Sequence, residues 1–123
     1  MATVRYLVND VDASLPFYAT LGFALVERWG PPFAQIARDD LQLWLSGPGA
    51  SAARPLADGR QPVPGGWNRI VVRVADLDAT LAQLRGMGVP ISAEVVKGPG
   101  GRQVLVHDPS GNPLELFEAP AAG

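Results

Sequence analysis

The carboxylate of Glu115 interrupts an apolar run near the end of the chain, in the stretch HDPSGNPLELFE at residues 107–118. A carboxylate in such a run could be a metal ligand, a general base, the partner of a buried cation or a charge on a solvated face. The chain has no Cys and one His, which excludes thiolate chemistry and limits any His–carboxylate pair to His107. His107 stands just before an Asp-Pro turn, and we predict an exposed residue at a strand end rather than a ligand.

The segments that would position Glu115 come from an internal repeat. The stretch VRYLVNDVDASLPFYATLGF (4–23) aligns without gaps with IVVRVADLDATLAQLRGMGV (70–89), and LQL (41–43) aligns with LEL (114–116). Two copies are too few for a solenoid, so the repeat indicates two copies of one supersecondary module. We expect a single domain over residues 1–123, with module one at 1–46, a Gly-, Pro- and Ala-rich linker at 47–66 and module two at 67–120.

Each copy predicts a strand, a helix and three further strands. An alternating strand comes first, and Asp10 or Asp12 then caps a helix that ends at Gly22. Turn residues separate the three strands that follow. The second copy repeats this order, so the predicted fold class is α+β, built from two βαβββ modules. The predicted strands are 3–8, 23–29, 33–39 and 41–46 in module one and 68–75, 91–97, 102–107 and 113–118 in module two, with helices at 12–22 and 77–86.

Strand alternation divides each sheet into a face that packs on the helix and an opposite face. In the last strands Leu43 and Leu45, and Leu114 and Leu116, take the helix side. The opposite face then mixes aromatic, apolar and charged side chains, which is typical of a small-molecule pocket, although a dimer seam would also bury it. We predict these ligand-binding residues there: Gln42, Trp44, Arg5 and Leu7 from module one, and Arg69, Val71, Arg73, Glu115 and Phe117 from module two.

The remaining aromatic residues divide into two groups. Trp29, Phe33 and Trp67 lie near predicted turns, and we expect them at the rim of the pocket, where flat ligands can stack on their rings. For the others we predict ordinary core packing; they are Tyr6, Phe17, Tyr18 and Phe23.

The paired modules, the two aligned stretches and the terminal DPSGNPLELFE resemble the vicinal oxygen chelate superfamily, the group of glyoxalases, bleomycin-resistance proteins and extradiol dioxygenases. The resemblance covers nearly the whole chain. It implies modules paired edge to edge, so that eight strands form a half-barrel around a cleft. It also implies a homodimer.

The metal-ligand positions of metal-dependent members correspond here to Thr3, Gln42, Arg69 and Glu115. A catalytic divalent cation needs about three or four His or carboxylate ligands, and an Arg places a permanent positive charge against the ion. We therefore expect no metal and no cofactor. We predict instead an ion pair between Arg69 and Glu115, which could be purely structural or could hydrogen-bond a ligand.

The stretch FAQIARDDLQLWLSG (33–47) resembles the antibiotic-binding branch of the superfamily. This implies a protein, not an enzyme, that sequesters a bleomycin-, mitomycin- or enediyne-type aromatic drug. Bleomycin is cationic, whereas Arg5, Arg69 and Arg73 stand here against Glu115, so the charge of the ligand stays open. Two alternatives remain: an enzyme of this fold, such as a lyase, an isomerase or a glyoxalase-like protein with Glu115 as general base, and an orphan metabolite-binding protein.

The composition argues against some other classes of partner. The net charge is −2 and no Lys/Arg cluster occurs, which argues against nucleic acid. No apolar run approaches the roughly 20 residues that span a bilayer, and the N-terminal segment lacks the pattern of a signal peptide. We expect a cytoplasmic protein without a membrane partner.

Overall fold

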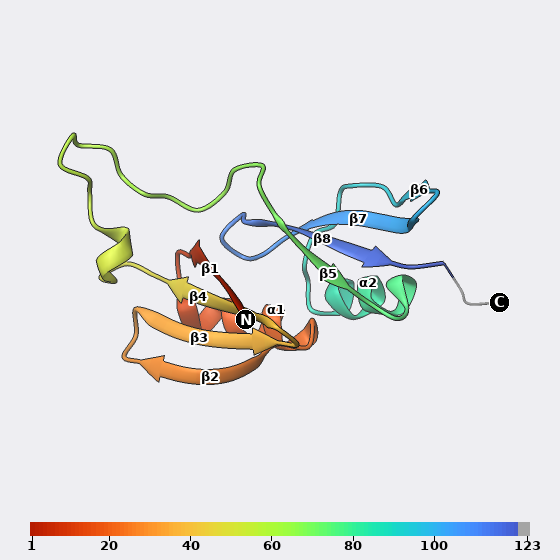
Figure 1. Ribbon diagram of the computed structural model, residues 1–123, viewed down its shortest axis with the longest axis horizontal. Coiled ribbons are helices and arrows are strands. Elements are labelled where there is room, and N and C mark those ends of the chain that lie inside the picture. The colour runs from red at the N-terminus through yellow and green to blue at the C-terminus, as the bar shows by residue number, and fades with distance from the viewer. Residues whose placement is uncertain (121–123) are drawn as a thin grey trace.

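The computed structural model describes residues 1–120, and its strands form two four-stranded sheets (Figure 1). The sheet order is β1-β4-β3-β2 in module one and β5-β8-β7-β6 in module two, with β1–β4 and β5–β8 as the parallel pairs. The α+β fold class and the two βαβββ modules are thus confirmed. The elements are β1 (Ala2–Leu7), α1 (Val11–Thr20), β2 (Ala24–Trp29), β3 (Phe33–Arg38), β4 (Leu41–Ser46), β5 (Ile70–Arg73), α2 (Leu77–Gly86), β6 (Val96–Gly98), β7 (Gly101–His107) and β8 (Pro113–Glu118).

Equivalent caps set the limits of both helices. The Asp10 carboxylate accepts a hydrogen bond of 3.1 Å from Ala13 N at the start of α1, so Asp10, and not Asp12, is the N-cap. Asp76 caps α2 in the same way, accepting from Ala79 N at 3.0 Å. The chain leaves α1 through Gly22, whose φ of +91° favours glycine.

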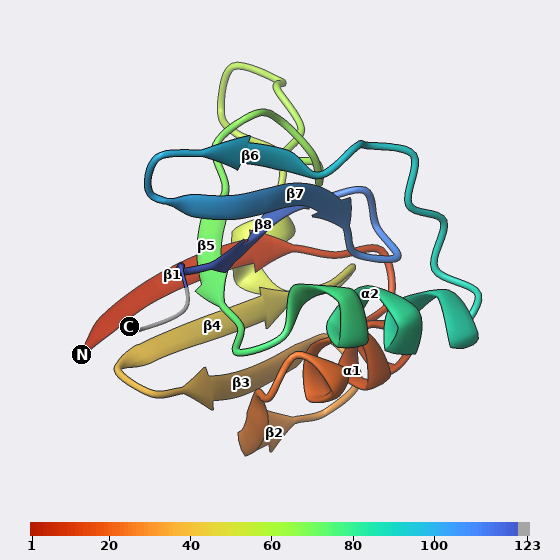
Figure 2. The ribbon, with the colours of Figure 1, turned by 90° about the vertical axis from the view of Figure 1, so that its right-hand side faces the viewer.

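One apolar core serves both modules. The helix-facing leucines of β4 and β8 are fully buried, and the buried residues of the two modules form a single cluster. Figure 2 shows α1 and α2 lying side by side. Phe17 and Phe23 meet Tyr18 edge to face, with ring centroids 5.1 and 5.6 Å apart, so these three aromatics pack in the core as predicted. The opposite face of each sheet lies outside this core.

The turn before β8 joins the modules through polar contacts. Asn112 Nδ2 donates to Leu7 O at 2.6 Å, and the Tyr18 hydroxyl donates to the Asp108 carboxylate at 2.7 Å. The Tyr6 hydroxyl donates to Pro113 O at 3.0 Å and accepts from Ile70 N at 3.1 Å. These contacts fix the end of β1 against the two strands of module two that carry predicted site residues.

Some strand limits differ from the sequence prediction. β5 spans Ile70–Arg73 and not 68–75, and β6 spans Val96–Gly98 and not 91–97. The second difference has a packing cause, because Val89, Ile91 and Ala93 pack against the core and draw the segment away from the sheet edge. The linker also contains a short 3-10 turn at Ser51–Ala53.

The two sheets share no strand pairing within residues 1–120. The helix-facing sides of both sheets meet in the shared core, and each four-stranded sheet presents an outer face of its own. Over the same residues, no helix is long and apolar enough to cross a membrane.

Candidate functional site

The outer face of the first sheet forms a pocket of about 380 Å³. Strand register explains its composition, because Arg5 and Gln35 both lie beside Trp44, and Trp29 lies beside Phe33. Alternation then places all five side chains on the same face. We call this the module-one pocket; its lining is Arg5, Trp29, Pro32, Phe33, Gln35, Trp44, Gly49, Ala50 and Ser51.

Three aromatic rings form a continuous wall of this pocket. Trp29 and Phe33 are stacked, with centroids 5.6 Å apart and an interplanar angle of 29°. Phe33 meets Trp44 at 6.0 Å and 71°. The Trp29 residue is 61% exposed, although burial of a tryptophan side chain normally stabilises a protein. The wall thus offers exposed aromatic surface on which a flat ligand can stack.

Arg5 is the charged group of the module-one pocket. Its Cζ lies 5.1 Å from the centroid of the Trp44 ring, and its Nη1 donates to Ser46 Oγ at 3.0 Å. Trp44 is held in turn by a 3.2 Å hydrogen bond from its Nε1 to Gln42 Oε1. Trp44 is therefore in contact with both of the predicted residues Arg5 and Gln42.

The outer face of the second sheet holds the predicted ion pair. Arg69 donates to Glu115 Oε1 from Nη2 at 3.0 Å and from Nε at 3.2 Å. The side chains are 33% and 13% exposed. Both line a module-two pocket of about 410 Å³, together with Ala93, Glu94, Val96, Gln103, Val104 and Leu105. Glu115 is thus paired with a partly exposed cation.

The other predicted site residues are dispersed. Val71 and Arg73 line a small pocket of about 160 Å³ between the modules, beside Arg38. Leu7 lines a groove against the linker. Trp67 is 82% exposed and lines none of these pockets. Phe117 lies on β8 beside Arg73 and is half-buried.

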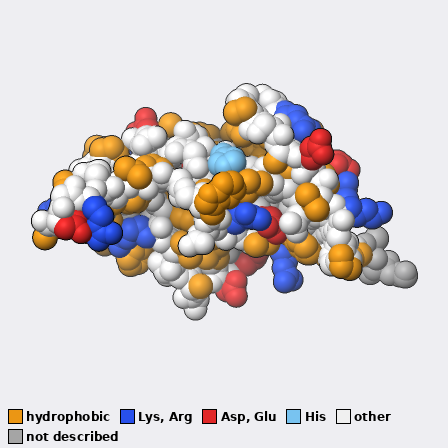
Figure 3. All heavy atoms as spheres, turned by 90° about the horizontal axis from the view of Figure 1, so that it is seen from above, with side chains coloured by type: hydrophobic (Ala, Val, Ile, Leu, Met, Phe, Trp, Pro, Cys, Tyr) orange, Lys and Arg blue, Asp and Glu red, His pale blue; other side chains and the backbone are white. Residues whose placement is uncertain are grey.

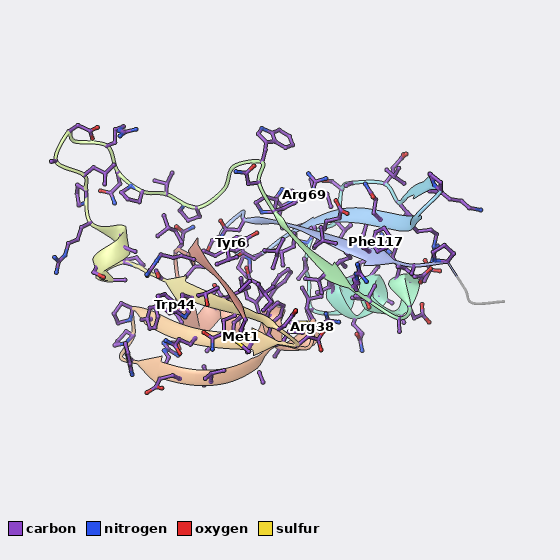
Figure 4. The ribbon with its side chains drawn as sticks, in the orientation of Figure 1. Met1, Tyr6, Arg38, Trp44, Arg69 and Phe117 are labelled. Carbon is purple, nitrogen blue, oxygen red and sulfur yellow. The ribbon has the colours of Figure 1, made fainter. Side chains whose placement is uncertain are left out.

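A single chain therefore does not gather the predicted residues into one cleft. Figure 4 shows Trp44 on the first sheet, Arg69 and Phe117 on the second, and Tyr6 between them. In the view of Figure 3, cationic and anionic side chains are scattered among hydrophobic ones, without a patch of a single charge.

Two polar residues on the outer face of the first sheet were missed by the sequence prediction. Gln35, which lines the module-one pocket, lies two positions after Phe33 on β3, and Ser46, which bonds Arg5, lies two positions after Trp44 on β4. The alternation that placed the aromatic residues was a sufficient signal for both. The lining residues Gly49, Ala50 and Ser51 come from the linker, which has no period to read.

Buried titratable groups lie between the modules. Burial raises the pKa of Tyr6, and the hydrogen bond from Ile70 N lowers it by a smaller amount. Burial and the neighbouring Asp108 carboxylate raise the pKa of Tyr18. Both hydroxyls therefore stay protonated and serve as fixed hydrogen-bond donors. His107 is exposed at the end of β7, as predicted.

The residues at the metal positions of the superfamily do not suit a divalent cation. Thr3 and Gln42 are register partners in the first sheet, and Arg69 bonds Glu115 in the second. Among residues 1–120, no group of three or more His, Asp and Glu side chains could hold a metal ion. The Arg69 guanidinium satisfies the one carboxylate of the set.

The comparisons with known proteins agree with this architecture. A family model described as the Glyoxalase/Bleomycin resistance protein/Dioxygenase superfamily matches residues 1–116. The chain belongs to this superfamily. A relative from Mycolicibacterium smegmatis, named only as an uncharacterized protein, is 32% identical over 115 residues, which cover 89% of this chain and 84% of the relative.

The solved structures that resemble this chain include an antibiotic binding protein and a lyase. TnmS3, an antibiotic binding protein from Streptomyces sp. CB03234, is 28% identical, with a TM-score of 0.71 over 96% of this chain and 93% of that one. Lactoylglutathione lyase from Agrobacterium tumefaciens has the same TM-score of 0.71 at 22% identity, over 96% of this chain and 92% of the lyase. The second likeness shows the fold alone.

Proposed function

We propose that this protein binds and sequesters an aromatic antibiotic of the bleomycin, mitomycin or enediyne type, without a metal and without chemical change. The observation that carries the proposal is the aromatic wall of Trp29, Phe33 and Trp44 in a pocket of about 380 Å³. A pocket of this volume is within the range of sites for drug-sized molecules. The likeness to an antibiotic binding protein at 28% identity supports the same function.

We further propose that the site is completed in a cytoplasmic homodimer. The pockets of the two outer faces are open, and Trp29, Val71 and Val96 are 61%, 51% and 56% exposed. Apolar exposure of this extent on two sheet faces is typical of surfaces that a partner covers. In such a dimer the module-one face of one protomer closes on the module-two face of its partner, and the predicted site residues that lie on these two faces meet across the interface.

The rival function is an enzyme of the same fold with Glu115 as general base. A general base must be tuned and positioned by a partner within hydrogen-bond reach. Arg69 bonds one oxygen of Glu115 and leaves the other free to accept, but the one His of the chain is exposed at the end of β7 and does not pair with Glu115. This arrangement favours binding over catalysis. An orphan metabolite-binding protein would use the same pocket with another ligand.

The first test is a titration of the chelator-treated protein with bleomycin, mitomycin and an anthraquinone-fused enediyne. Tryptophan fluorescence should be quenched saturably by at least one of them, because two of the three tryptophans line the module-one pocket. Chromatography should recover the drug unchanged. By calorimetry, Trp44→Ala should weaken binding by about tenfold or more, since it removes a stacking surface and the platform under Arg5.

The matched control is Trp67→Ala, which removes an exposed tryptophan outside the module-one pocket. It should change affinity less than Trp44→Ala does. The proposal fails if none of the three drugs binds, or if they are converted when divalent metals are added. Conversion would support the enzyme, and absence of binding would support a metabolite ligand.

A further inference from the structure

We infer that the ligand of the module-one pocket is a planar, fused-ring aromatic compound that carries an acidic oxygen at one edge, where the Arg5 guanidinium binds it. This inference rests on the proposed function and deepens it, because it selects among the ligand charges that the sequence leaves open.

Arg5 has hydrogen-bonding capacity that the described residues leave unused. A guanidinium has five N–H donors and stays charged at any physiological pH. Within residues 1–120, its one hydrogen bond goes to Ser46 Oγ at 3.0 Å, and Ser46 itself is 1% exposed. No carboxylate of the described residues forms an ion pair with Arg5. Several donors of a permanent cation therefore remain for a ligand.

The charge of the surroundings also favours an acidic ligand. No Asp or Glu lines the module-one pocket. The neighbouring Glu27 lies outside the lining, and its carboxylate accepts a hydrogen bond of 2.9 Å from Trp29 Nε1. A cationic ligand would thus meet Arg5 without a compensating acid among the lining residues.

The second module does not reverse this balance. Its outer face adds two acids and two arginines, so a cleft that joined both faces would gain no net charge from it; these residues are Glu94, Glu115, Arg69 and Arg73. Of these, Glu115 is already bonded to Arg69 at 3.0 Å.

The geometry of the aromatic wall also favours an acidic group near Arg5. Arg5 already occupies the cation–π position over Trp44, with its Cζ 5.1 Å from the ring centroid, so a cationic group of a ligand at that ring would meet the guanidinium. The stacked pair of Trp29 and Phe33 stays open to a flat ring system. An acidic oxygen at the edge of that ring system could then accept charge-assisted hydrogen bonds from Arg5.

The test compares three ligands of one shape: anthraquinone-2-carboxylate, its uncharged primary amide and the cationic 2-aminomethyl analogue. We expect calorimetry with the intact protein at neutral pH to show that the carboxylate binds at least about tenfold more tightly than the amide. The reason is that both Arg5 and the carboxylate are charged in their hydrogen bonds, whereas the amide is neutral. The cation should bind most weakly.

Three variants assign this preference to Arg5. Arg5→Met should abolish the difference between carboxylate and amide, whereas Arg5→Lys should keep part of it, because it keeps the charge but loses the fork of donors. Arg54→Met is the matched control, since it removes an equal charge from an exposed linker position outside the pocket, and it should leave the preference intact.

The inference is overturned if the amide or the cation binds as tightly as the carboxylate, or if Arg5→Met retains the preference. If that binding still depended on Trp44, the proposed function would stand with another ligand class. If none of the three compounds binds, the inference falls, and the drug titration above then decides the proposed function on its own.

Discussion

Asp108 is a buried carboxylate without a cationic partner in the described structure, and hydrogen bonds alone satisfy it. It is 4% exposed and accepts from the Tyr18 hydroxyl, from Asn112 Nδ2 and from the backbone N–H groups of Ser110 and Asn112. A buried carboxylate is tolerated only when its oxygens are well paired. These four hydrogen bonds explain how the turn 108–112 can place a carboxylate in a buried position between the modules.

The Tyr18 hydroxyl gives this contact a pH dependence. Its pKa is raised above the ordinary value of 10.0 by burial and by Asp108, so the folded state keeps the proton that the unfolded chain loses near pH 10. The contribution of the Tyr18 hydroxyl to the free energy of unfolding is complete below pH 10 and is lost as the pH rises above 10. We expect the free energy of unfolding to fall by about 1.4 kcal/mol per pH unit for this tyrosine above about pH 10.

Urea denaturation at a series of alkaline pH values measures this slope. Tyr18→Phe should reduce the slope and should also cost about 1–3 kcal/mol at neutral pH, because Asp108 loses a donor. Tyr6, whose pKa is also raised, leaves a residual slope in that variant. An unchanged slope in Tyr18→Phe would contradict the assignment.

At the scale of the element, the two aspartates at the start of α1 have different roles. Asp10 caps the helix, whereas Asp12 forms an exposed ion pair with Arg28 at 2.8 Å. Asp10→Ala should lower the free energy of unfolding by about 1 kcal/mol. Asp12→Ala should cost a few tenths of a kcal/mol, because exposed pairs contribute roughly 0–1 kcal/mol. Chemical denaturation of both variants checks the order, and a larger loss for Asp12→Ala would contradict it.

The elements were predictable to the extent that their residues alternate or repeat. The leucines of β4 and β8 alternate with polar or aromatic residues, so the strands and their buried faces followed from the sequence. The predicted strand 91–97 was wrong over the residues before β6. Val89, Ile91 and Ala93 also alternate with other residues, but they pack on the core outside the sheet. A period of two reports burial of alternate residues and not strand pairing.

At the scale of the whole molecule, the decisive unknown was how the two modules meet. The sequence predicted the ion pair of Arg69 and Glu115, which is present, but it missed Gln35 in the module-one pocket. The sequence could not show that both modules share one core and leave two separate outer faces, because apolar residues do not specify which module they pack against. The linker residues that line the pocket were not predicted, because the linker has no strand or helix periodicity.

Sedimentation should show whether the two outer faces close on each other. We expect the protein to sediment as a dimer of 13.0 kDa chains at micromolar concentration. Val71→Asp, which places a charge on the second sheet at a position 51% exposed, should shift it toward monomer. Val63→Asp is the control, because Val63 is 67% exposed in the linker. A monomeric wild-type protein would contradict the proposed dimer.

The two sides of β1 impose different constraints on neighbouring residues. Arg5 belongs to the pocket, whereas the hydroxyl of Tyr6, the next residue, bonds two backbone groups of the second module. Substitution at Arg5 therefore alters recognition, while substitution at Tyr6 alters how the modules fit. During adaptation to a changed ligand we therefore expect residue 5 to vary while Tyr6 stays constant. Tolerated and constrained positions then alternate along β1, because successive side chains point to opposite faces of the sheet.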